Sequence, residues 1–349
     1  MSHISKKTSE SEKTCRSRRA NPWVLLVLIV ILVIAAAASC LFGSVDLPWD
    51  KVWQSVVAEE TSQADGGMVD IFWQLRLPKT IVCILVGAIL AVCGAAYQSI
   101  FRNPLTDPYV LGVSSGASLG AAVAILLGFE AWKWGVSGMA LFTALLTVLL
   151  IYKIASIGNR MHTTTLLLTG VCFTLLISAV IMFLMELNQE QLERIVFWTM
   201  GGFNDVFWPD VWILLPVTVV GIGVVLWYSR DLNLLLAGSE EARSMGVEVE
   251  KVKRVLLLFT TLMVAFAVSA CGVIGFVGLI VPHAVRLVTG PDNRKVIPYS
   301  MFCGAIFLLV CYTLARTVLR PDELHVGSLT SIIGAPLFIY LLYRNKKKY

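Results

Sequence analysis

The fold is decided by the stretch VLLLFTTLMVAFAVSACGVIGFVGLIVPHAV, residues 255–285, which contains no Asp, Glu, Lys or Arg and is bracketed by Arg254 and Arg286. Its 31 residues would make a straight helix about 46 Å long, much longer than the roughly 30 Å hydrocarbon core of a bilayer. If both arginines lie on one side of a membrane, the stretch crosses it an even number of times. We therefore predict a hairpin of two crossings with its bend near Cys271 and Gly272.

The rest of the chain carries eight further uncharged stretches, each reaching or approaching the roughly 20 residues that one crossing needs. They are residues 20–45, 80–101, 108–129, 134–152, 161–185, 211–229, 296–315 and 324–343. The whole chain is 57% hydrophobic and 15% charged, whereas soluble domains are about 25% charged. The sequence therefore predicts an all-α polytopic membrane protein with about ten transmembrane helices.

The loops between these stretches separate the charges by side. With the N-terminus inside, 21 of the 28 Lys and Arg residues fall on the inner face and 14 of the 23 Asp and Glu residues on the outer face. Basic residues concentrate in cytoplasmic loops, so we expect a multi-pass protein of the cell (inner or cytoplasmic) membrane with both termini in the cytoplasm. The predicted domains are a basic tail at 1–21, a single transmembrane domain at 22–345 and a second basic tail at 346–349.

The basic tail at 1–21 has two interpretations. It could bind nucleic acid, but a cytoplasmic tail that orients the first helix explains the same residues, and we expect lipid contacts and no nucleic-acid partner.

Several kinds of chemistry are missing from the sequence. The dipeptide Gly-Lys of the phosphate-binding G-x-x-x-x-G-K-[ST] loop occurs nowhere, so the chain cannot hydrolyse ATP by that route. The predicted spans carry no mid-span Asp, Glu, Lys or Arg for an ion-coupled relay, and the eight cysteines have no C-x-x-C spacing. We expect no catalytic residue, no metal site and no bound cofactor in this chain. A partner on the cytoplasmic side is then the expected source of energy.

Helix breakers fall inside the predicted hairpin. Gly272, Gly275, Gly278 and Pro282 all lie within the twelve residues GVIGFVGLIVPH. Irregular backbone at membrane depth is tolerated only where it is buried in protein or lines a cavity. The pattern fits a broken helix beside a transport pathway, and it also fits the tight end of a hairpin.

Small residues recur at helix-contact spacing in two other spans. Without a hydrophobic driving force in lipid, such residues allow helices to approach closely, so they predict a tightly packed bundle. They are Gly87, Ala91 and Ala95 in one span and Gly112, Gly116 and Gly120 in the next.

The inner loop at 230–252 is the best candidate for a partner's docking site. A leucine-rich run ending at Gly238 predicts one short helix. Ser239 as N-cap, followed by two glutamates, predicts a second helix that ends at Gly246. Two short helices meeting at a glycine would form a compact knob on the inner face. An ordinary amphipathic connector fits the topology equally well.

Seven segments resemble one known family, and they occur in the family's order. They are RLPK (76–79), GAILAVCGAAYQSIFRNPLTDPYVLGVSSGA (87–117), LLLTG (166–170), WTMGGF (198–203), LLLAGSEEARSMGV (234–247), GVIGFVGLIVPHAVRL (272–287) and ELHVGSLTSIIGAPLFIYLL (323–342). The chain resembles the FecCD/BtuC-type permease subunits of type II ABC importers for ferric siderophores, haem and cobalamin. The resemblance covers essentially everything after the N-terminal tail.

The resemblance implies a type II ABC importer permease fold with ten spans. It also implies a second permease subunit, which we expect to be a second copy of this chain, and an extracytoplasmic substrate-binding protein. Two cytoplasmic ATPase subunits would hold ATP and Mg. In the family the loop matching 232–247 couples the permease to the ATPase. The coupling residues implied here are Leu234, Leu235, Gly238, Glu240, Glu241, Ala242, Met245 and Gly246.

The resemblance also implies docking and gate residues. Basic residues of the family's outer face dock the binding protein, and the matching positions are Arg76, Lys79 and Arg316. Lys79 departs from the usual arginine, so a bidentate carboxylate pair is not available there. Any one of these cations could instead be an interfacial residue. The inner gate falls near Thr163 and Thr164, although ordinary capping threonines would look the same. Gln189, beyond the outer end of the same span, is a further gate candidate.

The expected function is therefore that of a permease moving a ferric siderophore into the cytoplasm, through a pathway between the fifth, eighth and tenth spans. Cobalamin and haem are alternative cargoes within the family, and ferric siderophore is chosen as the family's commonest cargo. An ion-coupled secondary transporter and a non-transporting membrane subunit are the alternatives from other classes.

Overall fold

The computed structural model describes residues 20–43, 71–132, 134–157, 160–161, 163–320 and 322–346. Within these residues ten apolar helices match the predicted spans: α2 (Pro22–Leu41), α5 (Leu77–Ile100), α6 (Val113–Leu126), α7 (Gly135–Ala155), α8 (Thr163–Leu187), α10 (Trp208–Trp227), α13 (Val249–Cys271), α14 (Val277–Thr289), α15 (Asn293–Thr317) and α16 (Val326–Lys346). Eight are long and apolar enough to cross a membrane, and α6 and α14 are shorter. The all-α prediction with about ten spans is confirmed.

Short elements connect these helices. They are α9 (Leu192–Thr199), α11 (Ser229–Ala237), α12 (Ser239–Ser244), η1 (Ile71–Arg76), η2 (Pro108–Leu111), η3 (Phe129–Ala131) and η4 (Gln189–Gln191). Strands β1 (Ser156–Ile157) and β2 (Arg160–Met161) pair antiparallel between α7 and α8 and were not predicted. Residues 1–19 and 347–349 of the two predicted tails lie outside the described residues.

The bend of the predicted hairpin is where the sequence placed it. Helix α13 ends at Cys271, and its C-cap Gly272 has a φ of 68°. Helix α14 begins at Val277, directly after Phe276, which also has a φ of 68°. The uncharged stretch is therefore two helices joined by a short irregular segment.

Close helix contacts at small residues hold the bundle together. Helix α5 is its centre, with most of its apolar window buried. A Cβ on Gly87 would overlap the backbone of Gly304 on α15, and one on Gly94 would overlap the carbonyl oxygen of Gly278 on α14. Gly116 and Gly120 lie equally close to α7. The small-residue spacing therefore predicted real helix contacts within one chain.

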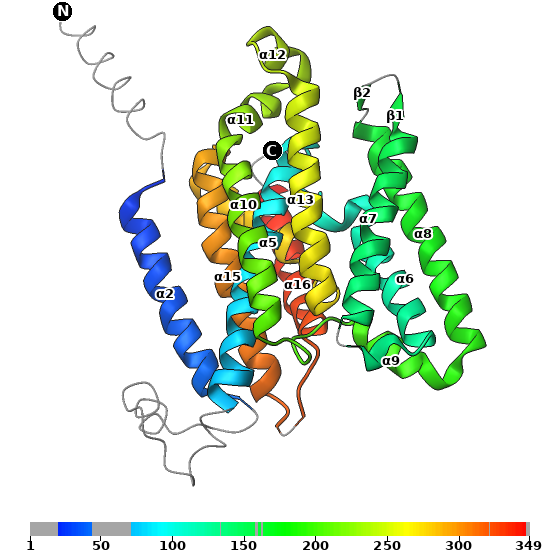
Figure 1. Ribbon diagram of the computed structural model, residues 1–349. Helices are drawn as coiled ribbons and strands as arrows, with labels where there is room; N and C mark the ends of the chain where they lie inside the picture. Colours follow the sequence, from blue (N-terminus) through cyan, green and yellow to red (C-terminus); the bar gives the residue numbers. More distant parts are fainter. Residues whose placement is uncertain are drawn as a thin grey trace, which may run out of the picture.

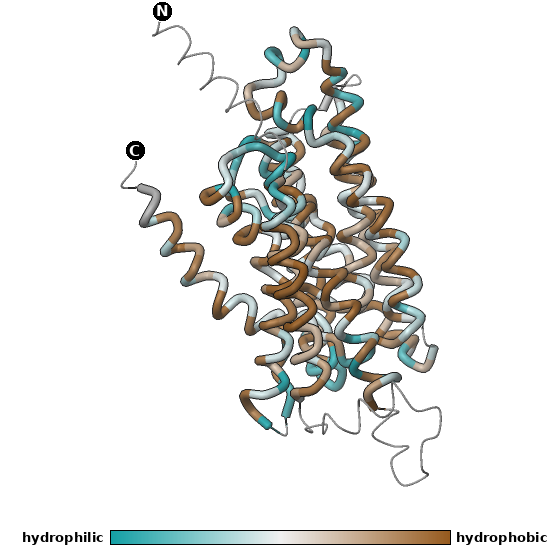
Figure 2. The backbone as a smooth tube through the Cα atoms, turned by 90° about the vertical axis from the view of Figure 1, so that its left-hand side faces the viewer, coloured by the Kyte–Doolittle hydropathy of each residue, from teal (hydrophilic) through white to brown (hydrophobic). Residues whose placement is uncertain are grey.

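The bundle has two polar ends. Figure 1 shows α11, α12 and the β1–β2 hairpin at one end, which we call the knob end, and α9 at the other, the α9 end. Helices α2 and α8 lie at the edges of the bundle in this view. Hydrophobic residues dominate the middle of the helices and hydrophilic residues gather toward the ends (Figure 2). This banding is what a protein that crosses a bilayer needs.

Candidate functional site

The first candidate region is the knob, defined here as residues 229–246. Helices α11 and α12 meet at Gly238, whose φ of 150° and ψ of 156° lie in a region that essentially only glycine adopts. Leu232, Leu235 and Ala242 are buried, and α11 packs on α5 and α15. The predicted pair of short helices meeting at a glycine is confirmed.

The predicted coupling residues divide into an anchored and an exposed set. Leu235, Gly238 and Ala242 are buried, and Leu234 is half-buried. The exposed set comprises Glu240, Glu241, Met245 and Gly246. The knob therefore holds to the bundle by apolar side chains and presents a methionine and two carboxylates to its surroundings.

The predicted N-cap of α12 is wrong. Gly238 occupies the N-cap position and Ser239 is the first helical residue. The Ser239 hydroxyl instead accepts a hydrogen bond from Nζ of Lys253 on α13, at 3.3 Å. Because Lys253 is only 5% exposed, this bond satisfies part of a buried ammonium group and ties α12 to the bundle.

A second cation joins α12 to α13. Arg243 pairs with Glu240 at 2.8 Å and with Glu250 at 3.0 Å. The pairs are partly exposed and contribute little individually, but together with Lys253 they restrict how α12 can turn on α13.

The second candidate region is the irregular segment 272–276 between α13 and α14. The hydroxyl of Tyr109 on η2 donates to the carbonyl of Ile274 at 2.9 Å and lies 3.3 Å from its backbone nitrogen. The carbonyl of Cys271 accepts a hydrogen bond from the backbone N–H of Gly202, at 2.8 Å. The segment is thus both the end of a hairpin and a piece of non-helical backbone whose polar groups are paired by neighbouring loops.

The four predicted breakers have different surroundings. Gly278 faces Pro108 and the carbonyl of Leu90, so helix packing requires a small residue there, whereas the nearest atom to a Cβ on Gly275 would be 3.8 Å away. Pro282 is buried inside α14. Gly272 packs against the carbonyl of Trp198.

The three predicted docking cations lie at the α9 end. Arg76 donates from Nη1 to the carbonyls of Cys40 and Leu41, at 2.9 and 2.8 Å, and so satisfies the last turn of α2. Arg316 pairs with Glu323 at 3.6 Å, and its guanidinium carbon lies 4.9 Å from the centre of the Tyr312 ring.

These contacts leave the three cations unequally available. Arg76 and Arg316 are 4% and 5% exposed, whereas Lys79 is half-buried and lies near Arg316 and Asp205. Their docking role stays a prediction, and Lys79 is the most accessible of the three.

The predicted gate residues lie at the two ends of α8. Thr163 is the first residue of the helix and is half-buried, and Thr164 is exposed. Gln189 is exposed in η4, beyond the opposite end. Many apolar side chains of α8 between them are exposed, including Leu175 at 66% and Met182 at 68%.

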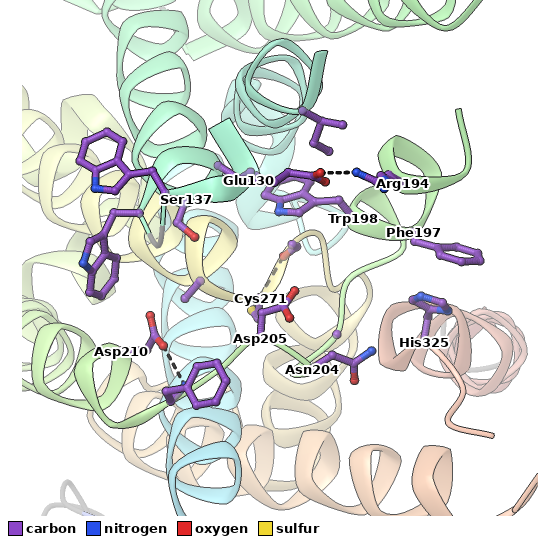
Figure 3. A pocket seen from close by; sticks show the side chains of 18 residues that line it. Glu130, Ser137, Arg194, Phe197, Trp198, Asn204, Asp205, Asp210, Cys271 and His325 are labelled. Carbon is purple, nitrogen blue, oxygen red and sulfur yellow. Dashed lines mark hydrogen bonds and ion pairs between the residues drawn. The ribbon is translucent and has the colours of Figure 1, made fainter. Parts of the chain in front are cut away.

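A cavity of about 620 Å³ opens at the α9 end (Figure 3). Aromatic side chains line it: Trp132, Trp134, Phe197, Trp198 and Phe207. Of its carboxylates, Glu130 pairs with Arg194, and Asp210 accepts a hydrogen bond from the backbone N–H of Phe207 at 2.9 Å. Asp205 is exposed, and Cys271 and Gly272 also line the cavity. The cavity therefore reaches from the surface loops to the start of the irregular segment at Gly272.

Sequence reasoning missed the cavity and the role of Tyr109. The cavity is lined by residues from Ile125 to His325, so no local pattern marks it. Tyr109 does fall inside one of the matched motifs, but its partner Ile274 is 165 residues away.

The family model described as the FecCD transport family matches residues 28–344. The chain belongs to this family. The chain is 43% identical over 302 residues to the cobalamin import system permease protein BtuC of Halobacterium salinarum, covering 85% of this chain and 79% of the relative. It is 38% identical to the vitamin B12 import system permease protein BtuC of Klebsiella pneumoniae, covering 78% and 82%. It is 35% identical to an uncharacterized ABC transporter permease, YvrB, of Bacillus subtilis, covering 87% and 89%.

A solved structure has the same fold. This chain matches a metal-chelate type ABC transporter in an inward-facing conformation with a TM-score of 0.81 and 31% identity, covering 93% of this chain and 100% of that one. The chain is therefore a multi-pass permease subunit of an ABC importer of the FecCD/BtuC type.

Proposed function

We propose that this permease imports cobalamin into the cytoplasm, driven by ATP that a separate subunit hydrolyses. The knob carries the ATP-driven part of the proposal, because it is anchored by buried leucines yet exposes Glu240, Glu241 and Met245. The cargo is inferred from the cobalamin permeases that this chain resembles at 43% and 38% identity.

The knob is built to transmit a displacement. Two ATPase subunits, each holding ATP and Mg, would bind one knob apiece on the cytoplasmic side. Leu232 and Leu235 are packed into the bundle, so movement of α11 carries α5 and α15 with it. Well-packed interiors transmit such shifts because they have little free volume in which to absorb them.

A second copy of the chain completes the pathway. Helix α8 exposes large apolar side chains along most of its length, and α16 exposes Ile332 and Ile339 at 69% and 66%. Lipid could cover such faces, but α8 also carries the candidate gate residues Thr163 and Thr164. We therefore assign the pathway to the space between α8, α14 and α16 of a homodimer, with Gln189 near its outer mouth.

The α9 end then faces outward and receives the substrate-binding protein. Lys79 is the accessible cation of the predicted docking set, and Arg76 and Arg316 support the helices beneath it. The neighbouring cavity offers aromatic faces and the carboxylate of Asp205. In this orientation the knob and both chain termini lie on the cytoplasmic side of the cell membrane.

A ferric siderophore is the second candidate cargo. The match to a metal-chelate type transporter favours it as well as cobalamin, because both cargoes are large metal chelates. Binding of each ligand by the cognate substrate-binding protein separates them: cobalamin import requires that protein to bind cyanocobalamin and to reject ferrichrome.

The deciding experiment reconstitutes the permease with its cognate ATPase and binding protein in proteoliposomes. We expect uptake of labelled cyanocobalamin that requires ATP and stops when the phosphate-loop lysine of the ATPase is replaced. Uptake that persists without ATP and collapses with an ionophore would identify a secondary transporter. A complex that hydrolyses ATP and moves neither ligand would contradict the proposal.

A further inference from the structure

A side-chain amide ties the knob to α15. Asn233 of α11 donates from Nδ2 to Oδ1 of Asp292 at 2.6 Å, and its Oδ1 accepts from the backbone N–H of Asn293 at 2.7 Å. A backbone N–H only donates and a carboxylate only accepts, so these two bonds fix the orientation of the amide. Leucine, of similar size, could make neither bond, and aspartate could make only one.

Asn293 continues this link into the bundle. It is fully buried at the start of α15, and its Oδ1 accepts from the hydroxyl of Ser99 on α5 at 3.0 Å. The same oxygen accepts from Nη2 of Arg286 on α14 at 3.3 Å, and that nitrogen also contacts the carbonyl of Ala95 on α5 at 3.3 Å. The link therefore leads from α11 through α15 to both α14 and α5.

The hydrogen bonds of this cluster are incomplete. Nδ2 of Asn293 and Nε of Arg286 are buried and have no hydrogen-bond partner among the described residues. A buried donor without a partner is unfavourable, so a rearrangement that pairs these donors would recover free energy. A cluster that would gain hydrogen bonds by rearranging suits a protein that must alternate between two states.

We propose that Asn233 is a positioning residue that transmits movement of the knob to α14 and α5 through Asn293 and Arg286. This rests on the proposed function, because an ATPase must move the knob. The apolar contacts of α11 hold it against the bundle but are non-directional, whereas the two directional bonds of Asn233 fix its register against α15. Helix α14 follows the irregular segment directly, so the link joins the docking site to a pathway helix.

The test measures coupling in the reconstituted complex of permease, ATPase and binding protein. The readout is the number of cyanocobalamin molecules taken up per ATP hydrolysed. We expect Asn233→Leu to retain ATP hydrolysis and to lower this ratio about fivefold or more, the lower range of allosteric coupling. The matched control is Asn103→Leu, the same change at an exposed asparagine whose side chain bonds Leu105 in its own loop, and it should leave the ratio unchanged.

A compensating pair separates transmission from folding. Asn233→Asp sets a carboxylate against Asp292 and should lower the ratio. Adding Asp292→Asn restores a donor for that carboxylate and keeps an acceptor for the backbone N–H of Arg294, so the double variant should recover coupling. These variants carry the test if Asn233→Leu does not assemble.

The outcomes distinguish this inference from the proposed function. A wild-type ratio in Asn233→Leu, or a reduced yield of complex whose surviving molecules keep the wild-type ratio, would overturn the inference and leave the proposed function intact. Failure of the double variant to recover coupling would also overturn it. A wild-type complex without ATP-dependent uptake would refute the proposed function, and the inference with it.

Discussion

The charged residues that were predicted to bind partners are buried to different degrees at the two polar ends of this permease. At the α9 end, Arg76 and Arg316 are almost completely buried and bind groups of their own chain. At the knob end, Glu240 and Glu241 are exposed, while the apolar side chains of the same two helices are buried. The first arrangement holds helices in place, and the second leaves charge available to a partner.

The difference arises from the groups that surround each charged side chain. The last carbonyls of a helix have no partner within it, and α2 ends beside Arg76, whose guanidinium supplies the missing donors. The knob glutamates follow a helix start, where the dipole already favours negative charge and the side chains can remain in solvent. A charged residue in a matched motif can therefore serve either the fold or a partner.

Replacing Arg76 should cause the largest loss of stability, at the α9 end. Arg76→Met removes two hydrogen bonds from a buried charged group to Cys40 and Leu41, at about 1.5–3 kcal/mol each, so we expect a loss of about 3 kcal/mol or more. The measurement is the thermal unfolding midpoint of the solubilised complex.

Lys79→Met is the matched control, because it removes a half-buried cation from the same end. It should change the unfolding midpoint little and instead weaken binding of the substrate-binding protein. If Arg76→Met unfolds like the wild type and loses only that binding, Arg76 belongs with the partner-facing charges and the contrast between the two ends fails.

Gly238→Ala, at the knob end, should have the next largest effect on stability. The substitution forces a Cβ into a backbone conformation at φ 150° that is essentially confined to glycine, which costs about 1–3 kcal/mol. We expect α11 and α12 to change their relative angle and uptake per ATP to fall. The same substitution at Gly223, in α10 and with open space around it, should be neutral or slightly stabilising. Equal effects of both substitutions on uptake would show that the angle at Gly238 does not matter.

The features that sequence predicted well are those with local causes. The bend at Gly272 follows from the length of one uncharged stretch, and the knob follows from a leucine run interrupted by Gly238. Both depend on residues close together in the chain. The close approach of Gly87 and Ala91 to Gly304 was also foreseeable, because small residues at four-residue spacing lie on one face of a helix.

The features that sequence did not predict depend on distant residues. The hydroxyl of Ser239 looked like an N-cap, but Gly238 takes that position and Lys253 uses the hydroxyl, 14 residues along the chain. Asn233 meets Asp292 across 59 residues. Arg76 is buried because α2 ends beside it, and no pattern within RLPK indicates where α2 ends.

Reversing the charge of Glu241 should have the smallest effect on stability and a large one on transport. Its side chain is exposed, and surface substitutions away from special features change stability by about 0.5 kcal/mol or less. Glu241→Arg should therefore insert and fold normally but lose ATP-driven uptake, because an opposite charge now meets the ATPase. Glu248→Arg makes the same charge change just outside the knob, at another exposed position, and should retain uptake. If both variants transport normally, the exposed charges of the knob do not bind the ATPase, and the buried anchors of α11 would have to act through the apolar surface at Met245 instead.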